Sequence, residues 1–125
     1  MQENDVFARL GEEGITRVVA AFYARVPADD VLGPMYPAED LAGAEERLRD
    51  FLIYRFGGPQ RYLEQRGHPR LRARHGRFAI DGRARDRWMQ LMTEAMAEAG
   101  VPADVESVMR EFLGGIATFL MNRGE

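Results

Sequence analysis

Four stretches of this 125-residue chain carry apolar side chains at the spacing of an amphipathic helix. β-Branched residues are few (eight Val, four Ile and three Thr), whereas Ala, Glu, Leu, Met and Arg are plentiful, which favours helix over strand. The clearest stretch is residues 12–26, and Pro27 ends it. Its apolar stripe consists of Ile15, Val18, Val19, Phe22, Tyr23 and Val26. The pattern predicts an all-α fold.

The other three helices are expected at residues 41–56, 83–99 and 102–122. Asp40 is predicted to be the N-cap of the first of these, and Gly57 the left-handed residue that ends it. The predicted inner faces are Leu41, Ala44, Leu48, Phe51, Leu52 and Phe56, then Trp88, Leu91, Met92, Ala95, Met96 and Ala99, then Val105, Val108, Met109, Phe112, Ile116, Phe119 and Leu120. Together the four helices supply enough apolar surface for one core, so residues 1–125 are interpreted as a single domain.

Proline and glycine also mark the start of the last helix and the link between the first two. Pro102 suits the first turn of the last helix. Asp29 or Asp30 is expected to cap a short turn after Pro27. The glycine and prolines that follow exclude a long element, so Tyr36 is predicted to lie on a corner.

Composition excludes several classes of protein. The chain has no cysteine, which removes disulfides, thiolate nucleophiles and Cys-ligated metal centres. No apolar run reaches the roughly 18–20 residues of a membrane span, and the N-terminus does not have the pattern of a secretory signal. A cytoplasmic location and the absence of a membrane partner are therefore expected.

The charge is unevenly distributed, although the net charge is only −3. Every basic residue is arginine, and residues 61–87 hold nine of the 17 arginines and three acidic residues. Much of the same region, residues 66–82, has an irregular pattern and contains both histidines, His68 and His75. A long irregular stretch in a compact domain usually has a function or a ligand that orders it. We therefore expect an anionic group near this segment, with a solvated basic loop as the alternative.

The residues themselves leave the chemistry open. The two histidines lack the spacing of a zinc site, and the lone serine, Ser107, lies within a predicted helix. Tyr23, Tyr36 and Trp88 each combine an apolar ring with one polar hydrogen that needs a partner when buried. They are either core residues with satisfied tips or donors into a ligand site. No catalytic residue is assigned with certainty.

Several long motifs resemble the group II truncated haemoglobins, the short bacterial globins with a two-over-two helical sandwich around a haem. They are FYARV (22–26), LGPMYPAEDLAGAEERLRDFL (32–52), GGPQRYLEQRGHPRLRARHGRF (57–78) and the tryptophan of RDRW (85–88). The resemblance covers roughly residues 6–122, and the two middle motifs are long and unusual. The chain departs from the family's common pattern at Tyr54-Arg55-Phe56 and at Ala79. Neither departure touches the expected iron ligand.

The resemblance implies haem b as the cofactor, with His75 as the ligand of the iron. Arg47 and Arg74 are then expected to bind the haem propionates, assisted by Tyr62. The apolar residues expected against the porphyrin are Leu48, Phe51, Leu71, Phe78, Ile80 and Met92. On the opposite side of the iron, Tyr23, Tyr36 and Trp88 match the family's polar residues. Their hydrogens would stabilise the partial negative charge of bound dioxygen, because Ala44 donates nothing.

The function expected from this resemblance is reversible binding of dioxygen and other diatomic ligands. The alternative is a redox enzyme at the same haem, acting as an NO dioxygenase or in peroxidase-like detoxification, with electrons from a separate reductase. A haem-free helical module that binds nucleic acid through its arginines is disfavoured, because the net charge is negative and a recognition-helix pattern is missing. A monomer or weak homodimer is expected.

Overall fold

The computed structural model describes residues 1–59 and 80–121, and every regular element in these two ranges is helical. The α-helices are α1 (Val6–Arg25), α2 (Leu41–Arg55), α5 (Gly82–Glu98) and α6 (Ala103–Phe119). Three 3₁₀ turns accompany them: η1 (Glu3–Asp5), η2 (Gly33–Met35) and η3 (Ala38–Asp40). The predicted all-α class is confirmed. Residues 66–79 of the irregular stretch predicted at 66–82 lie outside the described residues.

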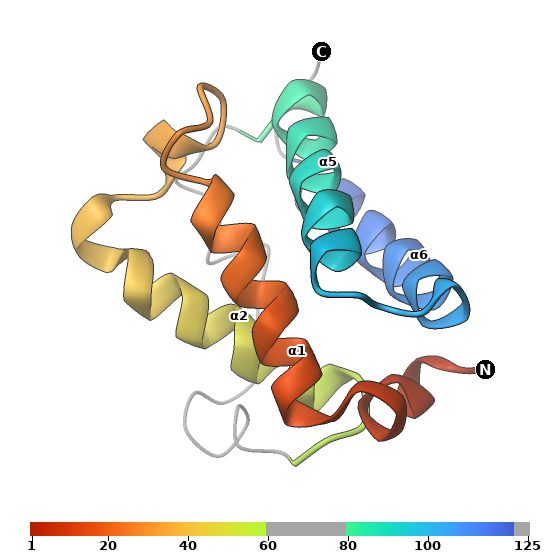
Figure 1. Cartoon of the computed structure of the whole chain (residues 1–125). Coiled ribbons are helices and arrows are strands. Elements are labelled where there is room, and N and C mark those ends of the chain that lie inside the picture. The colour runs from red at the N-terminus through yellow and green to blue at the C-terminus, as the bar shows by residue number, and fades with distance from the viewer. Residues whose placement is uncertain (60–79, 122–125) are drawn as a thin grey trace.

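The four helices form two pairs laid over each other, α1 with α2 and α5 with α6 (Figure 1). Helix α1 is central, because it packs against α2 on one side and against α5 on the other. An ion pair between Arg9 and Asp104, 2.8 Å from Nη1 to Oδ2, ties the start of α1 to the start of α6. No described helix is long and apolar enough to cross a membrane.

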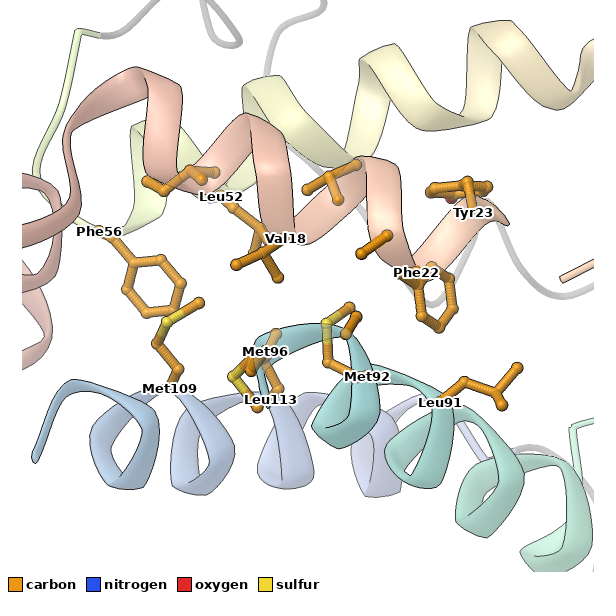
Figure 2. Packing of buried hydrophobic residues seen from close by; sticks show 14 of the residues in the cluster. Val18, Phe22, Tyr23, Leu52, Phe56, Leu91, Met92, Met96, Met109 and Leu113 are labelled. Carbon is orange, nitrogen blue, oxygen red and sulfur yellow. The ribbon is translucent and has the colours of Figure 1, made fainter. Parts of the chain in front are cut away.

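The core lies where the two pairs meet, and it consists of the predicted stripes. Figure 2 shows Val18 and Phe22 of α1 directed toward the methionines and leucines of α5 and α6. Phe22, Phe56 and Met109 are completely buried. Phe56, at the end of α2, packs edge-on against Phe112 of α6, with ring centroids 5.3 Å apart. All six residues of the stripe predicted for α1 are buried, as the period of the helix requires.

Two helix boundaries differ from the sequence predictions. Helix α1 begins at Val6 rather than residue 12, and Gly11 (φ +69°, ψ 174°) makes a break inside it. Glycine tolerates this conformation at no steric cost, so two helical segments run through one kink. Helix α6 ends at Phe119 rather than 122, and Pro102 is its N-cap rather than its first residue. Phe119, predicted on the inner face, is 56% exposed, because it lies at the end of the helix, beyond the packed part of α6.

The predicted cap at the end of α2 is confirmed. Gly57 adopts φ +99°, which is the left-handed region. A side chain at this position would also collide with the backbone carbonyl of Asn4. Gly57 therefore serves both the helix end and the close approach of the N-terminal segment, and the Phe7 N–H donates to the Phe56 carbonyl at 3.0 Å beside it.

Candidate functional site

A cavity of about 520 Å³ opens between α2, α5, α6 and the corner that follows α1. This volume lies within the range of small-molecule and cofactor sites. Its lining residues are Tyr23, Leu32, Met35, Tyr36, Pro37, Asp40, Leu41, Ala44, Arg47, Leu48, Phe51, Ile80, Ala84, Arg85, Trp88, Leu113, Ile116, Ala117 and Leu120. Most of these side chains are apolar, so the cavity suits a flat apolar ligand with a polar edge.

Helix α2 changes neighbours along its length, and this creates one wall of the cavity. The inner residues of its second half, such as Leu52 and Phe56, are completely buried in the core. The inner residues of its first half, Leu41, Ala44 and Leu48, are only half-buried and line the cavity. The predicted apolar stripe is therefore shared between the core and the site.

A compact corner between α1 and α2 turns Tyr36 toward the cavity. The Asp29 carboxylate accepts hydrogen bonds from the Val31 and Leu32 N–H groups, at 3.0 and 2.8 Å. A Cβ on Gly33 would lie 3.2 Å from the Pro27 carbonyl oxygen, so a larger residue would push the neighbouring backbone by a few tenths of an ångström. The expected cap by an aspartate in this corner is confirmed for Asp29.

The same carboxylate is also paired with Arg87 of α5. Burial by itself would raise the pKa of Asp29, but the Leu32 N–H, the Arg87 guanidinium and the Val31 N–H together hold that pKa below its ordinary value. The folded state therefore favours the ionised form of Asp29.

The pH dependence of stability should reveal this interaction. A lowered pKa adds stability that is fully present above the unfolded value of 3.8 and is lost as the pH falls through the folded value. We expect Asp29→Asn to lower the free energy of unfolding by about 1 kcal/mol at pH 7. The difference from the wild type should shrink below pH 4, as urea titrations followed by circular dichroism between pH 3 and 7 would measure. A difference that stays constant down to pH 3 would contradict this prediction.

Three polar tips meet inside the cavity. The rings of Tyr23 and Tyr36 contact edge to face, with centroids 5.7 Å apart and an interplanar angle of 85°. The Tyr23 hydroxyl and the Trp88 indole N–H both lie beside the Tyr36 hydroxyl, close enough to influence its ionisation. The Trp88 ring in turn rests against Phe22, at 5.3 Å between centroids. The structure thus brings together the three residues that the sequence indicates as donors or core residues.

Both phenols stay protonated at neutral pH. Burial is the main cause, and it raises the pKa of Tyr23 and that of Tyr36 above the ordinary value of about 10. The polar neighbours modify these shifts: Tyr36 raises the pKa of Tyr23 further, whereas Trp88 and Tyr23 act to lower the pKa of Tyr36.

At the rim of the cavity, Arg47 pairs with Asp40, at 2.6 Å from Nη2 to Oδ2. Asp40 is at the predicted N-cap position of α2, but its side chain makes no capping hydrogen bond. The 3₁₀ turn η3 leads directly into α2, and the carboxylate binds Arg47 two turns along instead. Gly43 lies between them, where a Cβ would come within 2.8 Å of the Asp40 carboxylate.

Most of the predicted site residues that the structure describes line the cavity. They are Tyr23, Tyr36, Arg47, Leu48, Phe51, Ile80 and Trp88. Met92 does not line it, because its side chain is completely buried in the core. The remaining predicted residues, Tyr62, Leu71, Arg74, His75 and Phe78, lie outside the described residues.

The sequence predictions missed several lining residues, among them a wall from α6 and Arg85 of α5. Leu113, Ile116, Ala117 and Leu120 make a wall from α6. Ile116 and Leu120 belong to the predicted apolar stripe, but periodicity does not tell which neighbour an apolar face meets. Arg85 of α5 was also missed, and its guanidinium donates to the Thr118 hydroxyl at 3.1 Å and to the Gly114 carbonyl at 3.4 Å.

Residues 5–122 match the family model described as bacterial-like globin. A curated relative, group 2 truncated haemoglobin YjbI of Bacillus subtilis, is 38% identical over 112 residues, covering 90% of this chain and 81% of the relative. The crystal structure of a haemoglobin from Chloroflexus aurantiacus is 46% identical, with a TM-score of 0.89 over 94% of this chain and 98% of that one. The X-ray structure of a truncated oxygen-avid haemoglobin from Bacillus subtilis is 33% identical, with a TM-score of 0.89 over 94% of this chain and 98% of that one.

The two crossed helix pairs of this chain, with an apolar cavity between them, have the architecture of a globin. This chain belongs to the bacterial-like globin family. Its fold is that of the truncated haemoglobins, as the motifs in residues 22–88 predicted. The family's cofactor is haem b, and the prediction of haem is confirmed at that level.

The described residues fit this cofactor. The walls from α2 and α6 are largely apolar, as a porphyrin requires, and the cavity also contains the polar tips of Tyr23, Tyr36 and Trp88. Arg47 at the rim supplies a guanidinium cation, which could pair with the carboxylate of a haem propionate. The chemical character of the cavity thus agrees with the family, independently of the matching sequences.

Proposed function

We propose that the protein binds dioxygen and other diatomic ligands reversibly at a haem b whose iron is held by His75. A ferrous haem supplies the site at which such a ligand binds. The observation that supports the proposal is the contact of Tyr23, Tyr36 and Trp88 inside an apolar cavity. The similarity to the Bacillus subtilis haemoglobin, which is described as oxygen-avid, also supports it.

In this proposal Tyr23, Tyr36 and Trp88 supply the hydrogen bonds to the bound ligand. Tyr36 lies beside both of the other polar groups, so its hydroxyl is central to the set. Neighbouring hydrogen-bonding groups polarise one another, which strengthens the donor that faces the ligand. In an apolar cavity such donors stabilise a partly negative ligand more than they would in water.

The rim residues would hold the cofactor's polar edge. Arg47 pairs with Asp40 in the structure, and both side chains are about half exposed. A haem propionate would compete with the Asp40 carboxylate for the same guanidinium. Arg74 and Tyr62 are proposed as further propionate partners, and Leu71 and Phe78 as apolar contacts on the side of His75; all four belong to residues 60–79.

The experiment is a set of visible absorption spectra of the purified protein. They are recorded in the ferric state, after reduction, and after reduction with dioxygen or carbon monoxide added. We expect an intense haem band that shifts with each ligand and returns when the ligand is removed. A protein that neither contains haem after purification nor takes up added haem would overturn the proposal.

A redox enzyme at the same haem is the second candidate function. It is favoured by one observation: Tyr23, Tyr36 and Trp88 are oxidisable rings that contact one another through hydrogen bonds. Repeated turnover would need electrons from a separate reductase. An assay of nitric oxide consumption with a chemical reductant separates the two functions. Consumption of one equivalent per haem indicates binding alone, whereas continued consumption indicates an enzyme.

A further inference from the structure

We propose that Asp29 and Arg87 are positioning residues that hold Tyr36 against Trp88 and thereby set the strength of the hydrogen bond to the ligand. Neither side chain lines the cavity. They act through the corner that carries Tyr36 and through the helix that carries Trp88. This inference rests on the proposed function of Tyr36 as the ligand's hydrogen-bond donor.

Consecutive hydrogen bonds within the corner connect Asp29 to Tyr36. The Asp29 carboxylate accepts from the Val31 and Leu32 N–H groups, and the Asp29 carbonyl accepts from Gly33 N–H at 2.9 Å. The Gly33 carbonyl then accepts from the Tyr36 N–H at 3.2 Å. The whole corner therefore moves with Asp29 rather than bending between Asp29 and Tyr36.

Helix α5 contacts this corner through two adjacent residues. Arg87 Nη1 donates to the Asp29 carboxylate and, at 3.0 Å, to Asp30 Oδ1. The next residue, Trp88, lines the cavity together with Tyr36, and its indole lies beside the Tyr36 hydroxyl. Neighbouring residues on a helix point in different directions, so one turn of α5 reaches the outer and the inner side of the corner. The distance between the Trp88 indole and Tyr36 thus depends on the Asp29–Arg87 contact.

This ion pair is suited to a positional role. The Asp29 side chain is only 7% exposed, so the surrounding water screens the contact less than it screens a surface pair. Hydrogen bonds weaken steeply as their geometry departs from the optimum. A small displacement of the corner would therefore move Tyr36 relative to the Trp88 indole and misdirect the Tyr36 hydroxyl.

The test uses Asp29→Asn and Arg87→Gln in the haem-containing protein, with carbon monoxide bound. Trp88 is the chain's one tryptophan, so its indole N–H gives a single assignable signal in a ¹H–¹⁵N spectrum. We expect this signal to move in both variants toward the position of a weaker hydrogen bond. The dissociation rate of dioxygen should rise by about twofold to tenfold, the worth of one weakened hydrogen bond. Arg87→Lys should restore part of both effects.

Infrared spectra distinguish positioning from a direct effect of charge. Removal of an anion and removal of a cation near the ligand would shift the stretching frequency of bound carbon monoxide in opposite directions. Loss of positioning shifts it in the same direction in Asp29→Asn and Arg87→Gln. Shifts of opposite sign, with an unmoved indole signal, would overturn the proposal.

Two further variants complete the experiment. Glu98→Gln removes another ion pair between α1 and α5, from Arg25 Nη2 to Glu98 at 2.8 Å, and should leave all three readouts unchanged. Tyr36→Phe tests the proposed function itself. If Tyr36→Phe changes dioxygen dissociation while the Asp29 and Arg87 variants behave like Glu98→Gln, the positioning role fails and the proposed function stands. If Tyr36→Phe has no effect, the proposed function of Tyr36 fails.

Discussion

Replacement of His75 by alanine is expected to abolish the haem absorption band of the reduced protein. A neutral imidazole nitrogen is the iron ligand that the resemblance assigns to this position, and alanine offers no atom that binds iron. The measurement is the haem content per chain after purification and after titration with added haem. We expect an essentially complete loss of stably bound haem, with partial recovery of a ligand-sensitive spectrum when free imidazole is added.

His68→Ala is the matched control, because His68 and His75 are the chain's two histidines. Both belong to residues 60–79. We expect His68→Ala to retain the full haem band and its response to dioxygen and carbon monoxide. Equal loss of haem in both variants would point to a general effect on this segment. Loss in His68→Ala alone would show that the assignment of the iron ligand is wrong.

Removal of both phenolic hydroxyls should speed dioxygen dissociation by about a hundredfold. A hydrogen bond to a partly charged group in an apolar cavity contributes roughly 1.5–3 kcal/mol. In Tyr36→Phe, the Tyr23 and Trp88 hydrogens remain as donors to the ligand. The single variant is therefore expected to show only about a tenfold increase, and the Tyr23→Phe/Tyr36→Phe double variant the larger effect. Stopped-flow mixing of the dioxygen complex with carbon monoxide measures each rate.

Two comparisons make this prediction specific. Carbon monoxide carries little negative charge as a ligand, so its dissociation rate should change much less in the same variants. Each single phenylalanine variant should speed dioxygen dissociation less than the double variant does. A single variant that equals the double variant would show that the other phenol contributes nothing to the ligand.

The site could be predicted only in part from residue patterns, and the reasons differ from residue to residue. The motifs indicate Tyr23, Tyr36 and Trp88 on the ligand side of a haem, and the structure brings their side chains together. They do not reveal that Trp88 of α5 and Tyr36 of the corner become neighbours, because that depends on how α5 packs against the corner. Met92 is expected against the porphyrin, yet it is buried among core residues, since its apolar character fits either place.

The sequence alone predicted those features that depend on a few neighbouring residues. The four helices, their breakers and the buried stripe of α1 follow from helical periodicity and from the conformations that proline and glycine allow, and these act over a few residues. Tertiary structure decided the rest. The Asp40 carboxylate binds Arg47 instead of capping α2, Asp29 joins the corner to Arg87, and α6 supplies a wall of the cavity. Each of these depends on which surfaces meet, and a periodic pattern defines a helix face without naming the neighbour that covers it.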